Sequence, residues 1–258
     1  MPIDFHSRQN RYTYSSRDVD PAWMEAVQAF VEPEGRRIAD IGCGGGIYSL
    51  AWHALGAAQV TGVDFSAEMV AASRERSAGV HGVRFVQGDA TATGLPSAGF
   101  DVVFQRALIH HLPDCTACFA EARRLLAPGG WLLVQDRTPE DVALPGSAEH
   151  LRGYFFDRFP RLRAFEAGRR PTSEVVAAAM QANGFTDIVH RSLWETRKRY
   201  ESFESLALDL AARTGRSILH ELSDDELQSL IDYLRSELPA HAGIVEKDRW
   251  TLWAARSA

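Results

Sequence analysis

The chain has 258 residues, of which 45% are hydrophobic and 24% are charged, a balance typical of a folded globular protein. Its formal net charge of -6 disfavours a broad phosphate-binding surface, and hence nucleic acid as a partner. With no signal-peptide core, no run of ~18 apolar residues and only three cysteines, we expect a cytoplasmic protein without a membrane span.

Short β-rich runs alternate with helical segments from residue 36 onward. Strands are expected at 36–42, 59–65, 83–89, 101–107 and 131–137, and helices at 47–57, 66–78 and 113–130. This alternation is typical of right-handed βαβ units. It predicts an α/β fold with a Rossmann-like, doubly wound parallel sheet.

The regular alternation ends near residue 138. A long connection is followed by a helix at 172–184, a strand at 186–194, two or three helices within 198–240 and a strand at 248–256. We therefore expect residues 1–138 to form a cofactor-binding core that begins with a helical segment. Residues 172–194 and 248–258 would complete its sheet, and residues 139–171 and 195–247 would form a helical cap over an acceptor site.

Four glycines stand within five positions directly after the first strand, in the segment ADIGCGGGIYS (39–49). The dinucleotide pattern G-x-G-x-x-G does not fit, because it would need glycine at position 47 or 49. Asp40, Gly42, Gly44 and Gly46 instead form D-x-G-x-G-x-G. A carboxylate two residues before the first glycine suits a cationic ammonium group and would repel phosphates. The loop therefore points to S-adenosylmethionine rather than NAD.

Two further acids follow the next two strands. Asp64 ends the second strand and can accept hydrogen bonds from both hydroxyls of a ribose. Gly88 and Asp89 end the third strand, where the carboxylate can accept from an exocyclic adenine amine. Three acids at the carboxyl ends of successive strands line one crevice, which is where open α/β sheets bind ligands.

These features resemble the class I S-adenosylmethionine-dependent methyltransferases, in particular the small-molecule group typified by the ubiquinone and menaquinone methyltransferases (type 11). The similar segments stand in family order and span about residues 36–137: ADIGCGGGIYS, GVDFSAEMV, VQGDATATGLPSAGFDVVFQRALIHHL and EARRLLAPGGWLLV. The resemblance implies a seven-stranded, mostly parallel sheet that ends in an antiparallel hairpin. It also implies methyl transfer to a small molecule, with S-adenosylhomocysteine as product.

The resemblance further implies which residues hold the methionine portion of the cofactor. Asp40 and the glycine loop would bind it, and Gln105, at the tip of the fourth strand, would turn a backbone carbonyl toward its ammonium group. Ala107 would lie close by. Tyr14 and Arg17, which precede the first strand, would close over the cofactor.

The nucleoside portion would be held by the ends of the second and third strands. By the same resemblance, Asp64 would bind the ribose, and Phe65 and Met69 would flank the adenine. Asp89 and Ala90 would bracket the other side of the adenine ring.

The segment LIHHLPDC, after the fourth strand, holds the concentrated candidates for proton transfer. His110 or His111 could act as a general base. Histidines at this place in the family often have no catalytic role, so we expect one of them to pack under the loop and the other to face solvent, and we leave the catalytic residue unassigned. Cys115 and Cys118 could supply only half a zinc site, and we expect no metal, with Cys118 buried and Cys115 at the surface.

The sequence does not identify the substrate. Residues 151–170 hold six arginines, two acids, four phenylalanines and a tyrosine. They could clamp an acidic or aromatic small molecule, lie along RNA, or form a solvated flap whose aromatics pack over the sheet. The basic run at 197–199 is expected to be a solvated face.

A small-molecule methyltransferase is therefore the leading function. An RNA methyltransferase is disfavoured, because no [D/N]-P-P-[Y/F/W] element follows the fourth strand and no cysteine is placed to attack a pyrimidine. A non-catalytic, regulatory S-adenosylmethionine-binding protein stays open, and an NAD-dependent reductase is disfavoured by the glycine spacing. The methyl acceptor, the methylated atom and the oligomeric state are left open.

Overall fold

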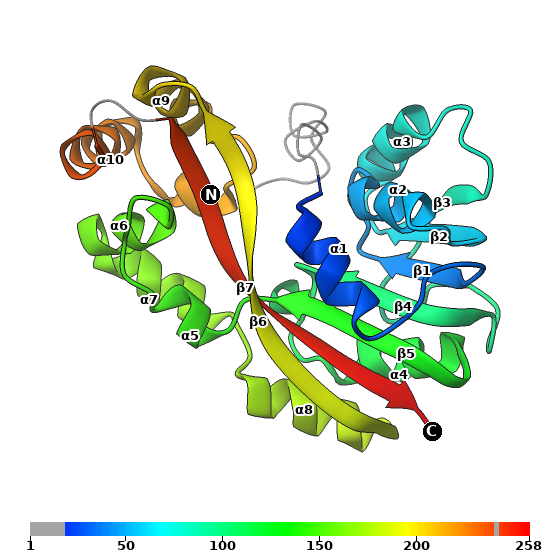
Figure 1. Cartoon of the computed structure of the whole chain (residues 1–258). Coiled ribbons are helices and arrows are strands. Elements are labelled where there is room, and N and C mark those ends of the chain that lie inside the picture. The colour runs from blue at the N-terminus through cyan, green and yellow to red at the C-terminus, as the bar shows by residue number, and fades with distance from the viewer. Residues whose placement is uncertain (1–18, 240–242) are drawn as a thin grey trace.

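The computed structural model describes residues 19–239 and 243–258, so Tyr14 and Arg17 lie outside the described residues. Within them, seven strands form one sheet in the order β3-β2-β1-β4-β5-β7-β6 (Figure 1). The strands are β1 (Arg37–Ile41), β2 (Gln59–Asp64), β3 (Val83–Gln87), β4 (Phe100–Arg106), β5 (Leu126–Asp136), β6 (Phe185–Tyr200) and β7 (Ile244–Ser257). Strands β1 to β5 are parallel, and β7 is antiparallel to β5 and β6. The predicted fold class is confirmed.

The strand order reverses at β1, which pairs with β2 on one side and β4 on the other. At such a switch point the connections leave in opposite directions and a crevice opens beyond the carboxyl ends of the strands. Asp40 pairs with Gly62 of β2 and with Phe104 of β4. The first acid of the predicted cofactor site therefore stands at the centre of the sheet.

Helices cover both faces of this sheet because successive side chains of each strand point to opposite faces. On one face, α1 (Pro21–Gln28) and α2 (Ile47–Ala54) bury an aromatic group around Trp23, whose ring centroid lies 5.0 Å from that of Tyr48 and 5.1 Å from that of Trp52. On the other, α4 (Thr116–Leu125) and α8 (Ser173–Ala182) pack against the strands. The helix α3 (Ala67–Arg76) begins at the predicted cap Ser66.

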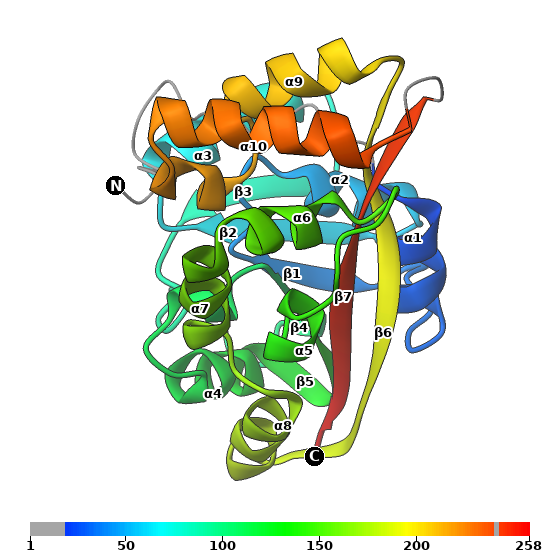
Figure 2. The same cartoon turned by 90° about the vertical axis from the view of Figure 1, so that its left-hand side faces the viewer.

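Strands β6 and β7 are longer than the sequence predicts, at 16 and 14 residues, and run side by side past the core sheet (Figures 1 and 2). Residues 198–200, expected to begin a helix, are the end of β6. In this extension the buried positions of β7 include Glu246 and Asp248. Charged residues at buried positions hide the period-two pattern by which a strand is usually identified.

The cap is built on this ribbon and has a hydrophobic core of its own, which includes Phe155, Leu206 and Leu230 (Figure 2). Its helices are α5 (Pro139–Val142), α6 (Leu151–Arg158), α7 (Pro160–Gly168), α9 (Phe203–Ala211) and α10 (Asp224–Glu237), with the 3-10 turn η3 (Ser217–Glu221). Helix α10 begins at a capping box. The phenylalanines at 155 and 156 fill this separate core, whereas the sequence suggested aromatics packed over the sheet.

One expectation about the cysteines was wrong. Cys115 is 5% exposed and belongs to the main core, because it precedes α4 where that helix meets the sheet. Cys118 is fully buried, as predicted. Among the described residues, none of the helices combines the length and the apolar composition required to cross a membrane.

Candidate functional site

A cavity of about 460 Å³ lies between the carboxyl ends of the core strands and the cap. Many of the predicted site residues line it: Asp40, Gly42, Gly44, Asp64, Phe65, Met69, Asp89, Ala90, Ala107, His110 and His111. Gly46, Gly88 and Gln105 are described but do not line it. The cavity therefore joins the predicted cofactor residues to the cap.

The glycine loop is tied to β2 by its backbone. The amides of Gly42 and Cys43 donate to the Val63 carbonyl at 2.7 and 3.0 Å. Gly44 has a φ of +52°, and a Cβ built on it meets no described atom within 4 Å, so its main chain is open to the cavity. A Cβ on Gly46 would stand 2.6 Å from Cζ of Phe85, so this glycine is required by packing.

Asp40 is a buried carboxyl, and the Ser49 hydroxyl donates to its Oδ2 at 2.6 Å. Burial raises the pKa of Asp40 to about 7, although this hydrogen bond opposes the shift. A carboxylate whose charge is destabilised by burial is stabilised by a cation placed beside it. A cation such as an ammonium group would therefore be stabilised beside Asp40.

Asp64 and Asp89 already accept hydrogen bonds from their own turns. Asp64 accepts from the amides of Gly44 at 2.8 Å and Ser66 at 2.9 Å, so it also holds the glycine loop in place. Asp89 accepts from the Thr91 amide at 2.7 Å. Each carboxylate keeps acceptor capacity, since an ionised carboxyl has about four lone-pair sites.

Gln105 is fully buried, and the residue after it reaches the cavity instead. The Arg106 guanidinium lies 4.3 Å from the Tyr48 ring centre and 4.1 Å from that of Trp250. Its Nη2 lies 2.7 Å from the Glu195 carboxylate. Arg106 could not be identified from the sequence, because its stacking partners come from α2 and β7.

His110 forms a close pair with Asp136, the last residue of β5. Its Nδ1 lies 2.9 and 2.8 Å from the two carboxylate oxygens. Burial would raise the pKa of Asp136, but His110 and Arg170 outweigh it and hold that pKa well below its usual range. An ionised Asp136 can only accept, so Nδ1 carries the proton and Nε2 is the basic nitrogen.

The surroundings of His110 favour its neutral form. Burial lowers the pKa of His110, although Asp136 opposes that shift. His111 is exposed, and its ring centroid lies 4.0 Å from that of His110. Asp136 therefore fixes the orientation of the His110 ring, and His111 lies beside it at the surface.

Arginines line the cap half of the cavity. Those that line the cavity are Arg106, Arg137, Arg152, Arg169, Arg170 and Arg216. Of the six arginines within 151–170, the other three pair at the surface with Ser229, Glu226 and Asp157. The acidic-ligand alternative for this segment thus has structural support, and only half of its arginines are solvated.

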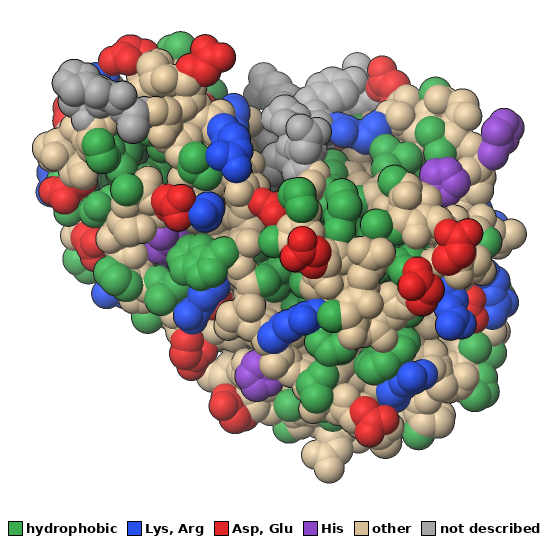
Figure 3. Space-filling view, in the orientation of Figure 1, with side chains coloured by type: hydrophobic (Ala, Val, Ile, Leu, Met, Phe, Trp, Pro, Cys, Tyr) green, Lys and Arg blue, Asp and Glu red, His purple; other side chains and the backbone are tan. Residues whose placement is uncertain are grey.

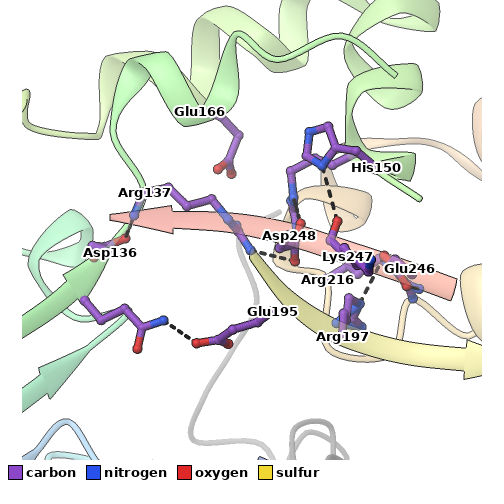
Figure 4. A network of polar contacts seen from close by, with 12 residues as sticks. Asp136, Arg137, His150, Glu166, Glu195, Arg197, Arg216, Glu246, Lys247 and Asp248 are labelled. Atoms are coloured by element: carbon purple, nitrogen blue, oxygen red, sulfur yellow. Dashed lines mark hydrogen bonds and ion pairs between the residues drawn. The ribbon is translucent and has the colours of Figure 1, made fainter. Parts of the chain in front are cut away.

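Two carboxylates on β7, Asp248 and Glu246, hold three of these six arginines, namely Arg137, Arg152 and Arg216 (Figure 4). Arg137 reaches across the strand to Asp248, with Nη2 2.8 Å from Oδ2, while Glu166 extends from α7 toward the same space. The basic run at 197–199 is not a solvated face throughout, because Arg197 is buried with Nε 3.2 Å from Glu246. Acids at alternate positions of a strand, 246 and 248, are the signal that could have revealed this network.

The described residues contain no group of three or more His, Cys, Asp or Glu side chains able to hold a metal ion. Cys43, Cys115 and Cys118 are all free thiols. The cavity is thus lined by arginines and His110 on one side, and by the glycine loop with the carboxylates of Asp40, Asp64 and Asp89 on the other.

Comparisons with known proteins agree with this geometry. Residues 39–134 match the family of methyltransferase domains. A ubiquinone biosynthesis O-methyltransferase of Xanthomonas axonopodis pv. citri (strain 306) is 38% identical over 130 residues, which cover 49% of this chain and 54% of the relative. Phosphoethanolamine N-methyltransferase 1 of Arabidopsis thaliana is 25% identical over 246 residues, covering 92% and 46%. The chain spans about half the length of the curated relatives it matches.

Solved structures show the same fold over nearly the whole chain. Haemonchus contortus phosphoethanolamine N-methyltransferase 2, in complex with phosphomonomethylethanolamine and S-adenosylhomocysteine, superposes with a TM-score of 0.62 at 19% identity. The match covers 98% of this chain and 60% of that one. The similarity therefore includes the cap as well as the sheet.

Proposed function

We propose that the protein transfers a methyl group from S-adenosylmethionine to a small molecule, a proposal supported by the match of residues 39–134 to the family of methyltransferase domains. The observation that carries this proposal is the single cavity that joins the glycine loop and Asp40 to the cap. Cofactor and acceptor can be aligned there, as a displacement reaction requires.

The residues present fit the cofactor. Asp40, whose charge is destabilised by burial, would hold the ammonium group of the cofactor. The open main chain of Gly44 would face the methionine portion of the cofactor. Asp64 would hold the ribose, and Phe65, Met69, Asp89 and Ala90 would enclose the adenine. When bound, S-adenosylmethionine supplies a methyl group on a sulfonium centre, which is already activated as an electrophile.

His110 is the residue we assign to proton removal. With Nδ1–H donated to Asp136, its Nε2 can take the proton that an oxygen or nitrogen nucleophile loses as it gains the methyl group. The proton comes to rest on the imidazole, where the ionised Asp136 stabilises the imidazolium. This role differs from the packing role favoured by the sequence, because the carboxylate that orients the ring lies 26 residues further along the chain.

The core and the cap have separate tasks in this proposal. Residues 1–138, 172–194 and 248–258 would form the cofactor half, and residues 139–171 and 195–247 would close the acceptor half. On the described part of the face drawn in Figure 3, Lys and Arg side chains are interspersed with Asp and Glu and form no continuous basic band. This distribution favours a small acceptor over RNA. The three free thiols support a reducing, cytoplasmic location.

Two measurements test the proposal. Calorimetry should detect binding of S-adenosylmethionine and S-adenosylhomocysteine but not NAD, and Asp40→Asn should weaken both. Deuterated methyl donor, incubated with the protein and a metabolite extract, should label at least one compound by mass spectrometry. Binding of NAD alone would end the proposal. Donor binding without any labelled product would favour the regulatory alternative.

A further inference from the structure

Four buried or half-buried arginines in the cap half of the cavity share only three carboxylates. They are Arg137, Arg152, Arg169 and Arg170, and their partners are Asp136, Glu166 and Asp248. With His110 neutral, this group carries one positive charge in excess. An uncompensated charge away from water is costly, so such an excess is expected where a ligand supplies the missing anion.

Arg137 shows the excess directly. Its Nη2 donates to Asp248 at 2.8 Å, and its buried Nε has no acceptor within residues 19–239 and 243–258. Burial and the neighbouring Arg152 lower the pKa of Arg137 to about 10. Burial and a neighbouring cation destabilise the charged form of this guanidinium, and an added anion would stabilise it.

Arg152 shares a carboxylate with Arg137, and Arg169 lines the same cavity. Arg152 already places Nε 2.9 Å from the Asp248 carboxylate, so one aspartate serves two guanidinium groups. Arg169 pairs with Glu166 through Nη2, while its buried Nε lacks an acceptor in the described part of the chain. Each of these arginines is oriented by a carboxylate and keeps N–H donors for something else.

Arg216 lines the same cavity and serves as a comparison, because its contacts are purely structural. It is fully buried, and its donors reach Glu246, Asp209, Tyr200 and a backbone carbonyl. None of its side-chain nitrogens is among the buried polar atoms without a partner in the described residues. Buried Nε atoms without a hydrogen-bond acceptor also occur on Arg106 and Arg197 in the described residues. Arg137 and Arg169 differ from Arg216 in that they line the cavity with fewer of their donors paired.

We propose that the methyl acceptor carries an oxyanion, a phosphate or carboxylate group, and that Arg137, Arg152 and Arg169 bind it. The planar fork of a guanidinium matches such groups with two parallel hydrogen bonds. Arg170 and Asp136 link this site to the proton acceptor, since Asp136 lies 2.7 Å from Arg170 and 2.8 Å from His110. That the oxyanion belongs to the acceptor rests on the proposed methyl transfer; the oxyanion site itself does not.

Calorimetry on the full chain tests the site with inorganic phosphate and with acetate, at constant ionic strength and with S-adenosylhomocysteine present or absent. We expect one of the two oxyanions to bind, and the preferred one identifies the acceptor group. Arg137→Gln should weaken this binding at least about tenfold, because it removes a charge-assisted pair. Arg161→Gln is the matched control: that arginine is 49% exposed and pairs with Glu226 at the surface.

Arg169→Gln provides a second variant in case Arg137→Gln does not fold, since its side chain is 22% exposed and Glu166 keeps Arg170. Binding of neither oxyanion to the wild type, or equal binding to the wild type and the folded variants, would overturn the proposal. S-adenosylhomocysteine affinity should stay within about twofold in all variants. Oxyanion binding without any S-adenosylhomocysteine binding would retain this site while removing the proposed function, so the two failures are distinguishable.

Discussion

The Arg137 guanidinium carbon lies 4.1 Å from the centre of the Trp250 ring. Arg106 stacks on the same indole at the same distance, and its other neighbour is the Tyr48 ring. Cation–π contacts therefore connect the first turn after the glycine loop to the cap half of the cavity. They also stabilise two guanidinium groups that are largely shielded from water.

Replacing this indole should weaken the oxyanion site without affecting the cofactor site. Trp250→Leu removes the aromatic face, and a partly desolvated cation–π contact contributes about 1–2 kcal/mol. We expect phosphate or acetate binding to fall about fivefold to thirtyfold, while Trp250→Phe, which keeps a ring, loses less. Calorimetry measures both. Equal losses in the two variants would show that size, not the aromatic face, matters at this position.

Binding of S-adenosylhomocysteine should depend on the ionisation of Asp40. With a pKa of about 7, this carboxyl is mostly charged at pH 8 and mostly protonated at pH 6, and only the charged form attracts an ammonium group. Affinity should therefore fall about tenfold from pH 8 to pH 6. Calorimetry at each pH is the measurement.

5′-Methylthioadenosine, which lacks the amino-acid portion, is the matched control ligand for Asp40. Its affinity should stay nearly constant over the same pH range. Asp40→Asn should abolish the pH dependence for S-adenosylhomocysteine. If both ligands lost affinity in parallel, a different group would be responsible.

His110→Gln should slow methyl transfer by about 10²–10⁴-fold with little change in S-adenosylhomocysteine affinity, as expected for loss of a general base. Burial lowers the pKa of His110 below its usual range. At saturating S-adenosylmethionine, where the ionisation of Asp40 no longer limits cofactor binding, turnover should therefore be nearly constant at neutral and alkaline pH and fall only on acidification. Turnover of the labelled metabolite against pH is the readout. His190→Gln, at an exposed position of β6, is the control, and full activity of His110→Gln would remove this residue from the mechanism.

Alanine should lower the free energy of unfolding by different amounts at two glycines of the same loop. Gly46→Ala forces a Cβ against Phe85 at a φ of +78° and should cost about 2–4 kcal/mol of unfolding free energy. Gly44→Ala meets open space and should cost about 1–2 kcal/mol, for its backbone conformation alone. Urea unfolding measures both.

The same two variants should rank the other way for S-adenosylhomocysteine affinity. Gly44 faces the cavity, so its new methyl group would occupy cofactor space, whereas Gly46 does not line the cavity. Calorimetry on the folded fraction of each variant is the test. A larger loss of affinity in Gly46→Ala would reverse the roles assigned here.

The cofactor half could be predicted from the sequence because its determinants are local. Each βα unit occupies a short window, and the glycine loop follows directly on the strand that ends with Asp40 and Ile41. The carboxyl ends of parallel strands meet at one edge, so Asp64 and Asp89 needed no long-range information to be placed beside the loop. Even there, packing decided that Gly46 and Gln105 face away from the cavity.

Only the tertiary structure decided how arginines and carboxylates are arranged in the proposed acceptor half. Arg137 and Arg152 meet Asp248 across 111 and 96 residues of chain, and they do so because β7 returns antiparallel beside β5 and passes under the cap. No local periodicity encodes such a meeting, since an arginine that pairs within a cavity and one that is solvated look alike in a short window. Residues 151–170 contain both kinds, and burial against the ribbon separates them. The sequence by itself determined the fold class and the kind of methyl donor it favours; the crossing of β7 decided where the positive charge gathers and which acceptor chemistry it suits.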